Sequence, residues 1–188
     1  TTCIRYPNHD RVHKLWLKGI NDRLFIPQFH GREHLNVNRW MKGLKTGDKG
    51  LQIMFEHGSI GSTFYKDSPI TEHLAAFSPE TKEDIDFYST ILFEGLSLFE
   101  KLCEYKASYF VASNSPEPKI LEKDLKENGI EYLTRYKLQR YPLGDKKFEN
   151  EINWLGRVNK LDQIIITRNC AFEPSDLTKN DWVDSCLS

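Results

Sequence analysis

Two histidines early in the chain have the spacing of a metal-binding pair. His30 and His34 are four residues apart and follow an apolar run at residues 24–29. On a helical turn, residues i and i+4 share one face, so both imidazoles could bind a single Zn²⁺. Spacing alone favours a structural role over metal binding for such a pair. The position at the end of a predicted strand makes the two roles about equally favoured. The chemistry indicated by the residues is the binding of a divalent metal ion.

Arg32 and Glu33 lie between the two histidines. A catalytic zinc usually has a third protein ligand, often a carboxylate, and keeps one position for water. On a helical turn Glu33 would point away from both imidazoles, so it is a poor third ligand. We expect it to orient a neighbour or to pair with Arg32.

Two further polar clusters follow predicted strands, at residues 113–115 and 168–173. In α/β proteins, ligands bind at the carboxyl ends of parallel strands. If these strands are parallel neighbours, both clusters line one rim with His30 and His34.

The elements that must position these residues follow from apolar periodicity and from turn residues. Residues 107–112, 117–128 and 130–134 read as strand, helix and strand, with Gly129 ending the helix, which predicts a right-handed parallel βαβ unit. Asn36 is the expected N-cap of a helix over 37–45, and Ser78 that of a helix over 79–106. We further expect helices at 9–23 and from 179, strands at 24–29 and 162–167, a short strand or other apolar segment at 51–55, an extended segment at 136–143, and a charged loop around 146–147.

The segment from Phe29 to Asn36 resembles bacterial proteins of the polysaccharide (de)acetylase family, related to the NodB-homology deacetylases (carbohydrate esterase family four). In that family the first and fifth residues of an H-[S/T]-x-x-H motif ligate zinc or a similar divalent ion. His30 and His34 match these positions, whereas Gly31 stands where Ser or Thr is usual. Residues 109–114, 129–133 and 166–175 also look like strands and strand ends of this group. The resemblance implies a fragment of a distorted (β/α) barrel, with parallel strands and outer helices.

Other parts of the family's active site have no counterpart in this sequence. There is no Asp-Asp-Gly segment, which supplies the general base and the third metal ligand, and no late histidine motif for the general acid. The catalytic residues are therefore unknown and expected outside this chain. Both ends read as cut, and we expect one α/β domain over 1–188, incomplete at each end.

The function that the resemblance implies is a metal-dependent hydrolase that removes acetyl groups from a polysaccharide or amino sugar. Zinc would polarise the acetamide carbonyl, and His30 and His34 would be ligands. Asn114, Arg168, Glu33 and Arg32 are candidate substrate contacts. For Asn114 and Arg168 the alternatives are a turn-capping and a surface ion-pairing role. Two alternatives for the protein are a carbohydrate-binding or scaffold relative whose site has decayed, and another metal hydrolase that uses the same histidines.

Composition excludes several other classes. The net charge is −1 with mixed signs, which gives no electrostatic basis for nucleic-acid binding. No apolar run approaches the ~20 residues of a membrane span, and no signal peptide is visible. Four scattered cysteines lack a C-x-x-C spacing and fit a reducing compartment, which favours a cytoplasmic location. The oligomeric state is not predicted.

Overall fold

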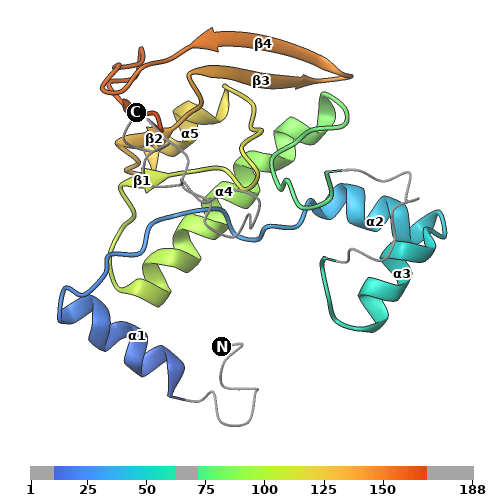
Figure 1. Cartoon of the computed structure of the whole chain (residues 1–188), viewed down its shortest axis with the longest axis horizontal. Helices are drawn as coiled ribbons and strands as arrows, with labels where there is room; N and C mark the ends of the chain where they lie inside the picture. The colour runs from blue at the N-terminus through green and yellow to red at the C-terminus, as the bar shows by residue number, and fades with distance from the viewer. Residues whose placement is uncertain (1–10, 62–71, 169–188) are drawn as a thin grey trace, which may run out of the picture.

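A computed structural model describes residues 11–61 and 72–168 (Figure 1). It has a mixed α/β fold, in which a small parallel sheet lies beside a long helix and a β-hairpin covers one end. The elements in chain order are α1 (Val12–Asn21), α2 (Val37–Lys45), α3 (Lys49–Glu56), α4 (Glu83–Cys103), β1 (Tyr109–Phe110), α5 (Leu121–Glu127), β2 (Tyr132–Thr134), β3 (Leu138–Gly144), β4 (Lys147–Ile152) and β5 (Ile164–Ile166).

The sheet has the order β1-β2-β5, and all its pairs are parallel. The predicted βαβ unit is therefore confirmed: β1 and β2 are neighbours, and α5 connects them. Gly129 follows α5 with φ +93°, a conformation that glycine adopts readily. Phe29 adds a single parallel bridge to Phe110, so the predicted strand at 24–29 is reduced to one paired residue at the edge of the sheet. Pro27 in this segment cannot donate a ladder hydrogen bond.

The main core lies between the sheet and the helices α4 and α5. Apolar side chains of the sheet meet one face of α4 and the inner side of α5, and all are at most 8% exposed: Phe29, Phe110, Leu133, Ile165, Tyr88, Ile91, Leu92, Leu96, Leu121 and Leu125. Each fully buried Leu or Phe contributes roughly 1.5–3 kcal/mol relative to an exposed one. This packing fixes the strand ends that carry the polar clusters.

Helices α2 and α3 form a second, smaller unit at the side of the sheet (Figure 1). Trp40, Leu51 and Met54 are buried together there. Of the two alternatives for 51–55, the strand is wrong, because these residues belong to α3. A five-residue apolar run fits either structure, and Asp48, whose carboxylate accepts from the Leu51 amide at 3.0 Å, decides for the helix. Asn36 caps α2 as predicted, accepting from the amide of Arg39 at 3.2 Å.

The start of α4 differs from the expectation. The helix begins at Glu83, not at residue 79, and Lys82 at its N-cap makes no side-chain cap. The side chain of Ser78 instead donates to Glu72 at 2.5 Å, so Ser78 is not the cap. Asp84 accepts from the amides of Glu80 and Thr81, both at 2.9 Å, and this closes the turn before the helix.

The charged loop expected around 146–147 is instead the tight turn of a hairpin. Strands β3 and β4 pair antiparallel, with Gly144 opposite Lys147. Asp145 and Lys146 between them have φ of 51° and 59°, as a type I′ turn requires. An Asp-Lys pair lacks the Asn-Gly signature of such turns, which is why the sequence did not predict it.

Among the described residues the strands form an open sheet and a hairpin, and no closed barrel is present. The prediction of an α/β fold with parallel strands and outer helices holds, and the barrel remains a prediction. The helix expected from residue 179 lies outside the described residues. No helix within the described ranges is both long enough and apolar enough to span a membrane.

Candidate functional site

The predicted rim exists as a pocket of about 290 Å³ at the carboxyl ends of the strands, which we call the strand-end pocket. Each strand end contributes to its lining: His30 follows the Phe29 bridge, Asn114 follows β1, Arg135 follows β2 and Arg168 follows β5. The full lining is His30, His34, Val111, Ala112, Asn114, Ser115, Thr134, Arg135, Tyr136 and Arg168. The parallel register thus brings together residues up to 138 positions apart (168 − 30). Residues 169–173 of the third predicted cluster lie outside the described residues.

The two imidazoles lie side by side in this pocket, with ring centroids 5.3 Å apart and ring planes at 63°. The Nδ1 atom of His30 is 2.8 Å from the Val111 carbonyl oxygen, and that of His34 is 2.5 Å from the Leu74 carbonyl oxygen. A carbonyl oxygen can only accept, so both Nδ1 atoms must carry the hydrogen. In the neutral rings, both Nε2 atoms therefore keep a free lone pair. Metal-ligating histidines are commonly fixed in this way.

The histidines are not on a helical turn, which corrects the geometric premise of the sequence argument. Residues 30–35 form a loop between the Phe29 bridge and α2. Gly31 has φ +117°, and a Cβ there would lie 3.3 Å from both the Phe77 ring and the Glu33 carbonyl oxygen. A Ser or Thr at position 31, as in the motif that the segment resembles, would strain this loop.

Arg32 and Glu33 pair with each other. The Nε and Nη2 atoms of Arg32 are 2.5 and 2.6 Å from the Glu33 oxygens, and a third contact joins Arg32 to Glu94 on α4. The hydrogen bond to Glu33 raises the pKa of Arg32. Neither side chain lines the strand-end pocket. The predicted ion-pair role of Glu33 is thus present, and the pair holds the histidine loop on α4.

Asn114 and Ser115 also line the pocket, and their φ values are 52° and 78°. Non-glycine residues in this region are uncommon, and they persist where the surroundings hold them. Ser113 supplies one such restraint, because its buried hydroxyl accepts from the Ala76 amide at 3.1 Å. Among the described residues, the side chains of Asn114 and Arg168 have no hydrogen-bond or ion-pair partner, so both are available to a ligand.

Sequence reasoning missed Arg135, which lines the pocket directly after β2. Its side chain is 1% exposed and its Nη1 atom lies 2.6 Å from Glu117, which is equally buried. Both Glu117 oxygens, and the Nε and Nη2 atoms of Arg135, lack a well-aligned hydrogen bond. Burial raises the pKa of Glu117 to about 7, although Arg135 opposes the rise. The position after a strand end was the one available signal for Arg135, as it was for Arg168.

His30 and His34 could supply two of the ligands of a metal site. Two imidazole Nε2 atoms on one pocket suit Zn²⁺ or a similar divalent ion. In residues 11–61 and 72–168, no group of three His, Cys, Asp or Glu side chains converges there or elsewhere. The described residues therefore supply two protein ligands, one fewer than a catalytic zinc usually has.

Comparison of the chain with protein-family models, with curated proteins and with solved structures gave no match. The family resemblance noted in the sequence therefore stays a prediction.

Proposed function

We propose that this protein is a metal-dependent hydrolase that removes acetyl groups from a polysaccharide or an amino sugar, with His30 and His34 as metal ligands. One observation carries the proposal: backbone carbonyls hold both Nδ1 atoms, which leaves both Nε2 atoms for one cation in the strand-end pocket.

When bound, a divalent ion would polarise the scissile carbonyl and lower the pKa of a water molecule. His30 and His34 would hold it through Nε2, with the loop anchored by the Arg32–Glu33–Glu94 contacts. The remaining coordination positions would be taken by water, by substrate, or by residues outside the described ranges.

Asn114 and Arg168 suit the substrate. The Asn114 amide offers both donors and an acceptor, and so can bind a sugar hydroxyl or an acetamide group. The Arg168 guanidinium is always charged and could stabilise the negative charge that develops on the carbonyl oxygen during hydrolysis. A general base and a general acid are not identified among the described residues.

The metal assignment is tested by Zn²⁺ titration calorimetry, followed by metal analysis after dialysis. We expect His30→Ala and His34→Ala each to weaken Zn²⁺ binding at least tenfold. His13→Ala is the matched control, because His13 lies on α1, its Nε2 contacts the Leu102 carbonyl, and neither residue lines the pocket. Unchanged zinc content in both pocket variants would contradict the assignment.

Activity is tested separately, by acetate release from acetylated sugars with and without a chelator. The second candidate function is a carbohydrate-binding or scaffold relative without activity. The absence of a third ligand among the described residues favours it. Sugar binding without acetate release, in protein loaded with zinc, would select this alternative.

A further inference from the structure

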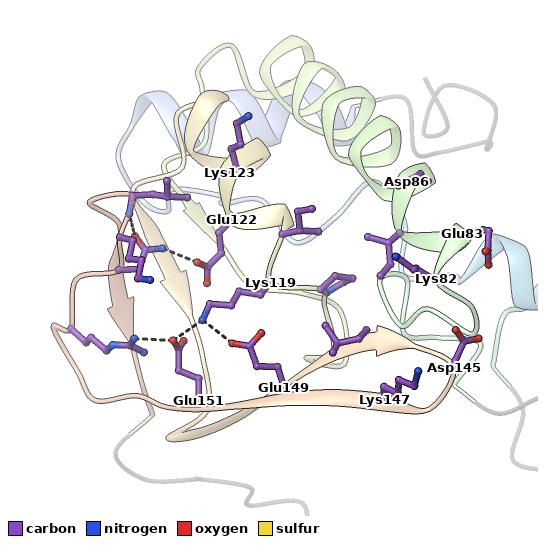
Figure 2. A pocket seen from close by; sticks show the side chains of 18 residues that line it. Lys82, Glu83, Asp86, Lys119, Glu122, Lys123, Asp145, Lys147, Glu149 and Glu151 are labelled. Atoms are coloured by element: carbon purple, nitrogen blue, oxygen red, sulfur yellow. Dashed lines mark hydrogen bonds and ion pairs between the residues drawn. The ribbon is translucent and has the colours of Figure 1, made fainter.

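A second and larger cavity lies elsewhere in the described part of the chain. It is a cleft of about 1020 Å³ between the start of α4, the segment leading into α5, and the β3–β4 hairpin (Figure 2). We call it the hairpin cleft. It shares no lining residue with the strand-end pocket. Its size is at the upper end of the ~300–1,000 Å³ typical of ligand sites.

The two sides of the hairpin cleft are joined by a row of paired charges. Lys119 reaches across from the α5 side, and its Nζ atom lies 2.8 Å from Glu151 and 3.3 Å from Glu149, both on β4. Arg157 donates to Glu151 at 2.9 Å. Figure 2 shows Lys119, Glu149 and Glu151 pointing toward one another across the cleft. The hydrogen bonds of Arg157 and Lys119 lower the pKa of Glu151 to about 2, so the row stays charged and paired over a wide pH range.

This row retains hydrogen-bonding capacity. An ammonium has three donors, and Lys119 uses two of them on the carboxylates. Each carboxylate accepts about four hydrogen bonds, and Glu149 is half exposed. Deeper in the cleft, Glu122 is 6% exposed and accepts from Asn159 at 3.0 Å. A ligand therefore meets donors and acceptors in alternation.

The overall charge of the lining argues against an ionic ligand. The cleft carries as many lysine and arginine side chains as aspartate and glutamate side chains. At the paired row, an anion would have to compete with Glu151 for Lys119 and Arg157, and a cation would have to compete with those two residues for the carboxylates. A hydroxyl group both donates and accepts, so it can join the row without breaking a pair.

Apolar side chains form the remaining surface. Ile120 is 68% exposed and Leu143 is 42% exposed, although both line the cleft, and Pro118, Ile85 and Leu161 adjoin them. Removing such surface from water is favourable by about 25 cal/mol per Å². A ligand that suits both surfaces has apolar C–H faces and a rim of hydroxyl groups.

We propose that the hairpin cleft binds a segment of an uncharged carbohydrate chain, with sugar ring faces on Ile120 and Leu143 and hydroxyl groups on the Lys119–Glu151–Arg157 row. The volume leaves room for more than one sugar ring, which favours an oligosaccharide over a single sugar. This inference goes beyond the proposed hydrolase, because the cleft needs neither the metal nor the histidines. It gives the protein a second carbohydrate contact, lined by none of the residues of the strand-end pocket.

The test is titration calorimetry with two uncharged probes, a tetramer of N-acetylglucosamine and a tetramer of glucose. We expect at least one to bind, and Glu151→Gln to weaken it about tenfold, since it removes the negative charge that holds two cations in place and replaces one acceptor oxygen with a donor. Ile120→Asp should weaken it by a similar factor, and its exposed position makes the fold tolerant of the change. Thermal melting of each variant checks that it is folded.

Two controls locate the ligand. Arg140→Met should leave affinity unchanged, because strand alternation places Arg140 on the opposite face of the hairpin, over the Phe148 ring. The double variant His30→Ala, His34→Ala should also bind normally. Loss of binding in either control would place the sugar elsewhere and overturn the proposal. Failure of both probes, or binding only of charged oligosaccharides or peptides, would overturn it as well.

Discussion

The strand-end pocket and the hairpin cleft use polar side chains in opposite ways. In the pocket, the two histidines are held at Nδ1 and present a free Nε2, and Asn114 and Arg168 have no partner within the described ranges. In the cleft, Lys119, Glu151 and Arg157 pair with one another. A side chain that is held at one atom and free at another, as in the pocket, can coordinate or polarise a ligand. Side chains that are already ion-paired, as in the cleft, can only bind a ligand through their remaining hydrogen bonds. The difference separates a candidate for chemistry from a candidate for binding.

Arg135 connects the two regions. It lines the strand-end pocket, while its Nη2 atom lies 3.8 Å from Glu122, a cleft residue. Its ion pair with Glu117 is the most buried in the described part of the chain. A buried ion pair rarely adds net stability, but the loss of one partner leaves an unpaired charge in the interior. Substitution of a residue in the buried Arg135–Glu117 pair should therefore have the largest effect on stability.

The largest effect is expected from Arg135→Met. This change leaves the Glu117 carboxyl without its counterion, and we expect a loss of about 3–5 kcal/mol in the free energy of unfolding, measured in urea at pH 8. Lys123→Met is the control, because the Lys123–Glu127 pair is 3.8 Å long and largely exposed. It should change stability by less than about 0.5 kcal/mol. Equal losses of stability in the two variants would show that the buried Arg135–Glu117 pair matters no more to stability than an exposed pair.

A smaller effect should appear in the pH dependence of stability. The pKa of Glu117 is about 7 in the folded protein, above its ordinary 4.5, because burial disfavours the charge. Between these values the folded state holds a proton that the unfolded state has released, so stability falls as pH rises. The fall is about 3 kcal/mol between pH 4.5 and 7. The Glu117→Gln variant should not show this fall in the free energy of unfolding. If the stabilities of the two proteins changed with pH in parallel, Glu117 would not be its cause.

The smallest effect concerns the cleft. The pKa of Glu151 is about 2, lowered first by Arg157, so its stabilising contribution is complete above pH 4.5 and is lost as pH falls through 2. Allowing for partial solvent screening, we expect Glu151→Gln to cost about 1 kcal/mol at neutral pH. The difference from the unmodified protein should vanish near pH 2, as followed by thermal unfolding at several pH values. A constant difference would mean that Glu151 acts through packing, not through charge.

Local patterns predicted several elements correctly. Asn36 capped α2 at the predicted position, and the order strand–helix–Gly129–strand gave the βαβ unit, because both depend on residues close together in sequence. The errors fall where short segments are ambiguous. The apolar run at 51–55 fits a strand or a helix, and an Asp-Lys turn is not the usual hairpin signal. At 51–55 the Asp48 cap selected the helix.

The sequence by itself determined which residues could meet at the site. It placed His30, Asn114 and Arg168 after apolar runs, and parallel strands end on one side of a sheet, so their meeting followed from topology. Only the tertiary structure decided their chemistry. The Val111 and Leu74 carbonyls that hold the imidazoles lie 81 and 40 residues away along the chain. The buried partner of Arg135 and the cleft beneath the hairpin likewise depend on contacts between distant segments. Spacing along a chain cannot specify such contacts, because they form only when the elements pack.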